Sequence, residues 1–168
     1  MATPSASSRT RLGLPLVTLI DTPGFLATRA DAGQGIVRDA AMLLAALAEL
    51  RPPRVTIVTR RALGAGWAVL APPSRGRATC YAWPTAEIAA MGGDAAADRL
   101  FDPAKDQKKR DYAARIADPT HAVAAGLVRA VIRPATTRQV IAAAFREAAE
   151  AQEFGSMLPN TFSNRSGT

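Results

Sequence analysis

Two short glycine-containing segments hold the residue types that could do chemistry. The first is Leu19–Phe25, LIDTPGF, an apolar run that ends in Asp-Thr-Pro-Gly. GTPases carry such a segment where an aspartate and a glycine approach magnesium and phosphate. The second is Leu63–Trp67, LGAGW, whose glycines let the backbone turn sharply and come close to a ligand. The pair raises two hypotheses, a nucleotide switch and a site built from backbone amides.

The nucleotide hypothesis fails on what accompanies the first segment. A GTPase needs an upstream glycine-rich phosphate loop with a lysine followed by serine or threonine. The first lysine of this chain is Lys105, and its asparagines are Asn160 and Asn164. An Asn-Lys-x-Asp guanine-binding strand end is therefore missing as well, and the sequence does not predict a GTPase.

Other catalytic classes lack their residues too. The chain has one histidine, His121, one cysteine, Cys80, and no Gly-x-Ser-x-Gly elbow. These counts leave no Ser-His-Asp elbow, no disulfide framework and no Cys/His metal cluster, so we expect no metal cofactor. A lone cysteine in a strand is expected to be a small buried hydrophobe, in a reducing, cytoplasmic protein. Backbone amides remain the expected catalytic groups.

The composition bounds the class of protein. A chain of 168 residues with 48% hydrophobic residues suits one domain with its own core. Its net charge of +7 is scattered and aromatics are only 5%, which favours a solvated basic surface or an anionic partner over nucleic acid. The apolar run 12–20 is too short to cross a bilayer, so no membrane partner is expected.

Hydrophobic periodicity and turn signals predict an alternation of strands and helices. We expect strands at 16–20, 55–59, 78–83 and 127–132, and helices at 36–50, 94–101, 118–126 and 136–153. Thr136 and Gln139 form a capping-box pattern for the last helix, while 84–93 and 102–111 are expected to be a connector and a charged surface segment. This order predicts an α/β domain at 14–153 between a disordered lead-in, 1–13, and a disordered tail, 154–168.

Several of these segments together resemble one family. LVTLIDTPGF, GQGIVRDAAMLLAALAE, VTIVTRRALGAGWAV, YAWPTAEIAAMGG and ADPTHAVAAGLVRAVIRPATTRQVI follow one another in an order similar to the β-type carboxyltransferase subunits of biotin-dependent acyl-CoA carboxylases. The resemblance covers about 14–150. It implies a crotonase-like fold of repeated ββα-type units, and only the second, C-terminal domain of a two-domain subunit.

The resemblance also implies a reaction. The C-terminal domain of the family handles biotin and the first domain handles the acyl-CoA, such as acetyl- or propionyl-CoA. N-carboxybiotin releases carbon dioxide, backbone N–H groups hold the ureido oxygen, and biotin removes the α-proton of the thioester. In this chain the matching amides are those of Ala65 and Gly66, which would form a backbone oxyanion hole.

The remaining matched residues are assigned by the same resemblance. Residues expected to bind biotin are Gly64, Phe25, Trp83, Pro84 and Thr85. Residues expected to shape the structure near the site are Asp21, Pro23, Gly24 and Glu87.

The resemblance implies partners as well. They are a biotinylated carrier subunit, an acyl-CoA-binding carboxyltransferase domain or subunit, and an acyl-CoA substrate in a homo- or hetero-oligomer. The chain departs from the family after DTPGF and at Arg129-Ala130. A second hypothesis therefore stays open, that of a non-catalytic or degenerate crotonase-like module that assembles with carboxylase subunits.

Overall fold

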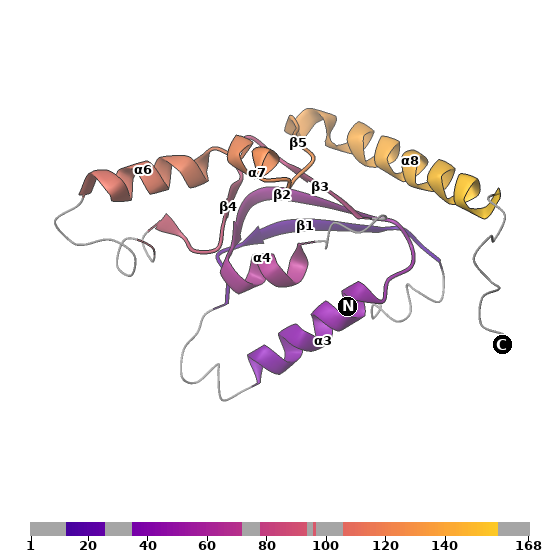
Figure 1. The fold of residues 1–168 in the computed structure, drawn as a ribbon, viewed down its shortest axis with the longest axis horizontal. Coiled ribbons are helices and arrows are strands. Elements are labelled where there is room, and N and C mark those ends of the chain that lie inside the picture. Colours follow the sequence, from indigo (N-terminus) through magenta and orange to yellow (C-terminus); the bar gives the residue numbers. More distant parts are fainter. Residues whose placement is uncertain (1–12, 26–34, 72–77, 94–95, 97–105, 158–168) are drawn as a thin grey trace, which may run out of the picture.

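A parallel β-sheet forms the centre of the computed structural model, which describes residues 13–25, 35–71, 78–93, 96 and 106–157 (Figure 1). Hydrogen bonds order the strands β1-β2-β3-β5, and β4 pairs with the far end of β2. The strands are β1 (Leu16–Thr22), β2 (Arg54–Leu63), β3 (Ala78–Ala82), β4 (Glu87–Ala89) and β5 (Ala130–Val131). Parallel pairing brings the carboxyl ends of β1, β2 and β3 to one edge.

Strand β2 lies between two neighbours and is buried over most of its length. Its first half pairs with β3, from Arg54 opposite Ala78 to Val58 opposite Ala82. Its last three residues pair instead with β4, with Leu63 opposite Ala89. The continuous β-branched run of β2 is the pattern expected of a parallel strand that is covered on both faces.

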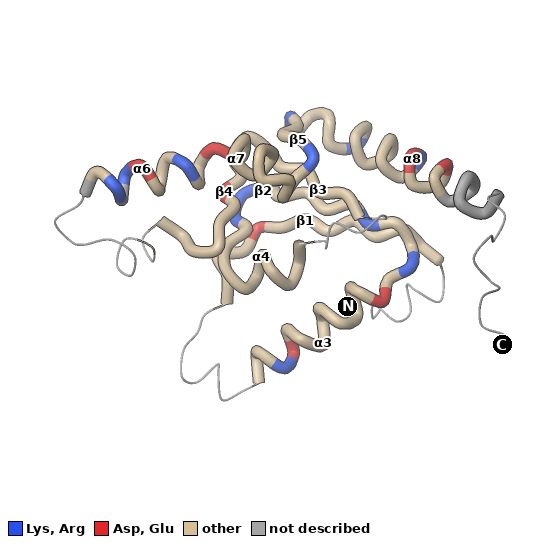
Figure 2. Tube along the Cα trace, viewed as in Figure 1, with Lys and Arg blue, Asp and Glu red and all other residues tan. Residues whose placement is uncertain are grey.

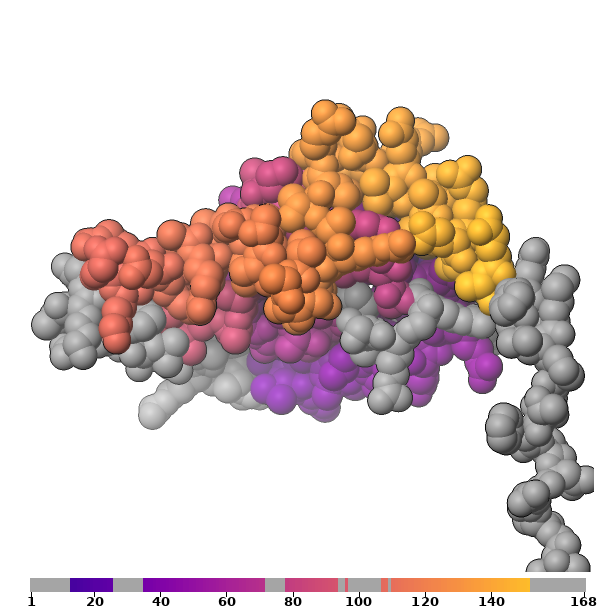
Figure 3. Space-filling view, turned by 45° about the horizontal axis from the view of Figure 1, so that its top comes forward, coloured from indigo at the N-terminus to yellow at the C-terminus, as the bar shows by residue number. Residues whose placement is uncertain are grey.

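Helices lie on both sides of the sheet (Figure 1). They are α3 (Ile36–Ala48), α4 (Gly64–Leu70), α6 (Asp106–Ala117), α7 (Thr120–Ala124) and α8 (Thr137–Met157), with a 3-10 turn at Pro134–Thr136. Helix α4 follows β2 without a linker and contacts β1, whereas α3 contacts α4. Figure 3 shows α6 and α8 extending toward opposite ends of the molecule.

Two hydrophobic clusters use alternate residues of β2, because successive side chains of a strand point to opposite faces. The first combines alanines with β-branched residues, and its members are Ile20, Val58, Ala62, Cys80, Ala82, Ala86, Ile88, Ala122 and Val128, with Trp67 and Leu70 of α4 against them. The second holds larger side chains, and its members are Val55, Ile57, Tyr81 and Ala144, with Trp83, Ala130, Ile132, Val140, Ile141 and Phe145 against them. Helix α8 covers the second cluster.

The α/β fold and the first three strands are confirmed, while four local predictions are wrong. The connector 84–93 contains β4, which is too short for a periodicity signal. The predicted strand 127–132 is reduced to two residues. The Thr136 hydroxyl donates to the carbonyl of Arg133 at 2.8 Å, so a 3-10 turn replaces the capping box there. The last helix runs on to Met157, and the predicted helix 94–101 lies outside the described residues apart from position 96.

Helix α3 has an exposed apolar surface. None of its residues is buried, and Val37 and Met42 are 72% and 65% exposed. Figure 2 shows charged residues on only a short part of α3, whereas α6 carries charged residues along its length. No helix that the structure describes is long and apolar enough to cross a membrane.

Candidate functional site

A cavity of about 380 Å³ opens where the carboxyl ends of β1 and β2 meet the segment after β4. Three short segments and the start of α3 line it, and its lining residues are Pro23, Gly24, Phe25, Ile36, Val37, Leu63, Gly64, Ala65, Ala90, Met91 and Gly92. The volume falls in the range of small-molecule sites. The fold thus brings LIDTPGF, LGAGW and the end of the YAWPTAEIAAMGG motif together around one cavity.

The Leu63–Trp67 turn changes directly from strand to helix. Gly64 has φ +58°, a left-handed conformation that suits glycine, and it begins α4. The first N–H groups of a helix have no partner within it, so the Ala65 amide is free of the helix's own hydrogen bonds. Ala65 is exposed and lines the cavity. With seven residues, α4 is too short for a strong dipole, so any pull on an anion comes from these local amides.

Gly66 has a different environment from Ala65. It is buried and does not line the cavity. A Cβ added there would lie 2.9 Å from both Cγ2 and Oγ1 of Thr22 and 3.3 Å from Cα of Gly24. Its small size is therefore explained by the close approach of α4 to the end of β1. That the amides of Ala65 and Gly66 form an oxyanion hole stays a prediction.

The two glycine segments also touch directly. Gly24 has φ +104°, and its N–H donates to the Thr22 hydroxyl at 3.2 Å. A Cβ at Gly24 would lie 3.2 Å from the carbonyl oxygen of Leu63. The DTPG turn thus packs directly against the LGAGW turn, a contact that neither segment predicts alone.

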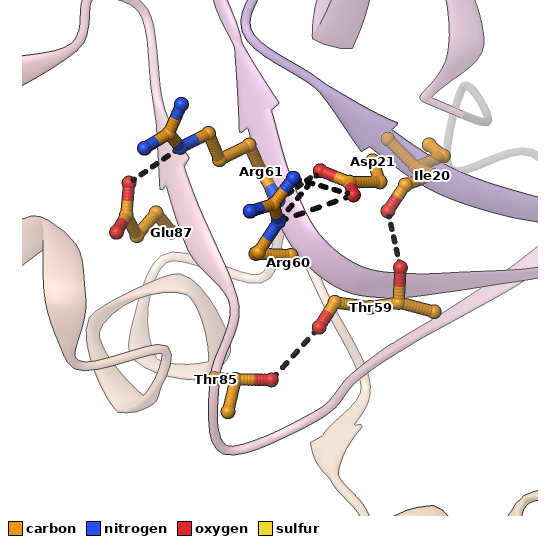
Figure 4. A network of polar contacts seen from close by, with 7 residues as sticks. All are labelled: Ile20, Asp21, Thr59, Arg60, Arg61, Thr85 and Glu87. Atoms are coloured by element: carbon orange, nitrogen blue, oxygen red, sulfur yellow. Dashed lines mark hydrogen bonds and ion pairs between the residues drawn. The ribbon is translucent and has the colours of Figure 1, made fainter.

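Asp21 joins β1 to β2 beside this support (Figure 4). Its carboxylate accepts from Nε of Arg60 at 3.1 Å and from the backbone N–H of Arg61 at 3.3 Å. The hydrogen bond from Arg60 is the main cause that lowers the pKa of Asp21 from its ordinary value of 3.8. The geometry is that of a structural carboxylate, held by an arginine and an amide, in the place where a GTPase would hold magnesium.

Figure 4 shows the same edge tied to the β3–β4 turn. The Thr59 hydroxyl donates to the carbonyl of Ile20 at 3.0 Å, and the Thr85 hydroxyl donates to the carbonyl of Thr59 at 2.8 Å. Glu87 forms an ion pair with Arg61, with Oε2 3.7 Å from Nε. Thr85 and Glu87 therefore fix strands to one another, and neither lines the cavity.

Trp83 and Pro84 also lie outside the cavity lining. The Trp83 indole N–H donates to the Thr137 hydroxyl of α8 at 2.9 Å, and its ring packs on the second hydrophobic cluster. Of the residues expected to bind biotin, the structure brings Gly64 and Phe25 to the cavity with Ala65. It places Trp83, Pro84 and Thr85 along the turn behind it.

Two contacts near the cavity were not predicted from the sequence. The Tyr112 hydroxyl of α6 donates to the carbonyl of Met91 at 2.7 Å. The Nε2 atom of His121, on α7, lies 2.9 Å from the carbonyl oxygen of Ile88. The partners are 21 and 33 residues apart in sequence, on elements with no shared pattern, so no sequence signal could have paired them.

The described residues bound the chemistry of the site. Among them, no three His, Cys, Asp or Glu side chains gather as metal ligands would. Burial raises the pKa of the Cys80 thiol to about 12, which makes it a poor nucleophile at neutral pH. The cavity offers an apolar wall formed in part by the two glycine turns, with Ala65 among its lining residues.

Comparison with known proteins identifies the family. The model of the carboxyl transferase domain matches residues 8–161, so this chain belongs to the carboxyl transferase domain family. It is 39% identical over 142 residues to the methylmalonyl-CoA decarboxylase subunit alpha of Propionigenium modestum, covering 79% of this chain and 28% of the relative. It is 41% identical over 138 residues to the propionyl-CoA carboxylase beta chain of Roseobacter denitrificans, covering 79% and 27%.

Solved structures agree in fold. The transcarboxylase 12S hexamer core superposes with a TM-score of 0.79 and 33% identity, over 97% of this chain and 32% of that chain. The geranyl-CoA carboxylase beta subunit of P. aeruginosa has a TM-score of 0.72 at 23% identity, over 88% and 30%, which supports the fold alone. The crotonase-like fold is thereby confirmed. The chain spans about a quarter to a third of the length of these relatives.

Proposed function

We propose that this chain is the biotin side of an acyl-CoA carboxyltransferase, which transfers a carboxyl group from carboxybiotin to the α-carbon of an acyl-CoA. The observation that carries the proposal is the cavity, which Ala65 lines together with both glycine turns, in a chain that belongs to the carboxyl transferase domain family. The group to be bound is a flat ring system that carries one oxygen acceptor, and an apolar cavity with a few amide donors suits it.

The residues of this chain would hold and orient the biotin ring. Carboxybiotin, when bound, supplies the carbon dioxide and a ureido oxygen whose negative charge grows during transfer. In this proposal the Ala65 N–H, which has no partner within α4, donates to that oxygen, and Gly64 leaves the approach open because it has no side chain. Phe25 and Met91 supply apolar contact surface to the ring and help to exclude water. A preorganised donor of this kind stabilises developing charge without reorganising during the reaction.

A second polypeptide or domain would complete the site. Val37 lines the cavity yet is 72% exposed, and the apolar residues of α3 beyond it are uncovered. Uncovered apolar surface that continues from a ligand cavity is typical of an interface. We place the acyl-CoA-binding half on this face, because the chain spans only about a quarter of the length of relatives that are named for acyl-CoA substrates. The carboxyl donor would arrive on a biotinylated carrier protein.

The function is tested by reconstitution. The chain is mixed with the amino-terminal domain of the Roseobacter denitrificans beta chain and with a biotinylated carrier that bears a labelled carboxyl group. We expect label in acetyl-CoA or propionyl-CoA only when the chain is present. Wild-type relatives of full length serve as the positive control for carrier and substrate.

A second function is favoured by the exposed face of α3. A non-catalytic module would assemble with carboxylase subunits through that face and transfer nothing. Stable co-elution with the amino-terminal domain, without transfer of label, would support this reading against the first. The absence of both assembly and transfer would contradict both readings.

A further inference from the structure

Two side chains from separate helices hold the segment that forms the third wall of the cavity. The Tyr112 hydroxyl donates to the carbonyl of Met91 at 2.7 Å, and His121 Nε2 lies 2.9 Å from the carbonyl oxygen of Ile88. The two carbonyls bracket Ala89 and Ala90, at the point where β4 ends and the cavity wall begins. A segment fixed at both ends loses the freedom that a short strand at the end of a sheet would otherwise keep.

This segment lies directly against the LGAGW turn. Ala89 pairs with Leu63, the last residue of β2 before the turn. A Cβ at Gly64 would lie 3.6 Å from the carbonyl oxygen of Ala90, and a Cβ at Gly92 would lie 3.2 Å from Cδ1 of Leu63. A displacement of the wall would therefore reach the backbone beside the Ala65 amide.

The surroundings of His121 restrict where its proton sits. Nδ1 contacts the carbonyl oxygen of Asp118, and Nε2 faces that of Ile88, so both ring nitrogens meet acceptors. A neutral imidazole carries one N–H and can donate to only one of them. Asp118 has a second link to α7, because its carboxylate accepts from the Thr120 N–H at 2.9 Å and from the Thr120 hydroxyl at 2.6 Å. Among the described residues, no second hydrogen bond links α7 to Ile88 in the way that Thr120 links α7 to Asp118.

We propose that His121 is a positioning residue for the cavity. Its ring carries a proton on Nε2 and donates it in a hydrogen bond to the Ile88 carbonyl. Together with Tyr112, His121 holds the cavity wall at Ala90–Gly92 against the LGAGW turn. The site that it positions is the one assigned to carboxybiotin, so its effect on transfer rests on the proposed function. Its effect on the wall rests on the structure alone.

The proton position is tested by nitrogen NMR. His121 is the only histidine, so selective ¹⁵N-histidine labelling of the full chain gives signals from this ring alone. At pH 7.5, a condition chosen for the experiment, we expect a protonated Nε2. A ring whose Nε2 carries no proton would overturn the proposal.

The link to the wall is tested by a matched pair of variants. The amide nitrogen of glutamine can take the place of Nε2, whereas that of asparagine reaches only the place of Nδ1. We expect the ¹³C-methyl signal of Met91 to stay near its wild-type position in His121→Gln and to shift or broaden in His121→Asn and in Tyr112→Phe. Val123→Ala, an exposed change on the same helix, is the control. Equal Met91 signals in all folded variants would overturn the proposal that His121 and Tyr112 hold the cavity wall.

The functional arm uses the reconstituted assembly. We expect His121→Asn to lower kcat/KM for the biotinylated carrier about 10-fold, since small misplacements of binding groups are costly, and His121→Gln to retain most of it. Equal loss in both variants would point to a general structural role and contradict the positioning role. A wild-type assembly without transfer would refute the proposed function, and the NMR results would still decide the inference.

Discussion

The two faces of the sheet differ in the side chains that pack on them. The face beneath α8 contains Ile57, Tyr81 and Phe145, large side chains that fill space. The face that leads to the cavity includes several small residues, such as Ala62, Cys80 and Ala82, and nearby backbone turns come within contact distance of one another. The face beneath α8 obtains stability from buried volume, whereas the face that leads to the cavity obtains a defined site from close approach of the backbone. Changes on the two faces should therefore separate stability from function.

The largest loss of stability is expected on the face beneath α8. Ile57 is fully buried, and Ile57→Ala should lower the free energy of unfolding by about 3 kcal/mol, from lost transfer energy and the cavity left behind. Chemical denaturation measures it. At a temperature where the variant is folded, the Met91 methyl signal should be unchanged, and a shifted signal would contradict the separation of the faces.

A somewhat smaller loss is expected from crowding the other face. Gly66→Ala places a methyl group 2.9 Å from Thr22 and should cost about 1–3 kcal/mol through overpacking. In contrast to Ile57→Ala, this change should also move the Met91 signal. Combined with Thr22→Ala, its cost should be less than the sum of the single changes. Strict additivity would show that the two residues do not compete for space.

Asp21 gives a still smaller, pH-dependent effect. Its pKa is lowered by Arg60, so the ionised form stabilises the folded state above the ordinary pKa of 3.8, and this contribution disappears as the pH falls through the lower folded value. The difference in unfolding free energy between wild type and Asp21→Asn should therefore be largest near neutral pH and shrink below about pH 4. A difference that grows on acidification would contradict this sign.

Cys80 should show no reaction at all in the folded protein on the scale of minutes. It is buried, and its pKa of about 12 leaves little thiolate at pH 8. A disulfide reagent such as Ellman's should modify it only after unfolding in denaturant. Rapid modification of the native chain would show that this face opens more readily than its packing implies.

Sequence patterns predicted the packed parts of this fold better than the site. The β-branched run of β2 records burial and the helical spacing of α3 records period, and the structure confirms both. The run of β1 forms the predicted strand, but only Ile20 of it is buried and Leu19 is 64% exposed. No hydrophobic periodicity indicates the contact between Gly66 and Thr22. The same is true of the contacts that Tyr112 and His121 make. They arise from tertiary approach of segments 21 to 44 residues apart, which a single sequence does not encode locally.

The matched motifs contained both kinds of information. Trp83 and Ala65 belong to equally recognisable segments, yet Trp83 packs beneath α8 while Ala65 opens into the cavity. Trp83 follows the end of β3 and is held by its hydrogen bond to Thr137, whereas Ala65 lies in the first turn of α4. A family resemblance therefore indicates which segments matter, and the structure separates the residues that line the site from those that support it.

The central claim is that the Ala65 amide holds the oxygen of carboxybiotin during transfer. Ala65→Pro removes this N–H at a first-turn helix position, where proline is tolerated and no helical hydrogen bond is lost. Ala65→Ser keeps the amide and is the matched control. In the reconstituted assembly, the rate of labelled carboxyl transfer should fall about 100-fold or more in Ala65→Pro relative to Ala65→Ser. Equal rates in two folded variants would contradict the claim.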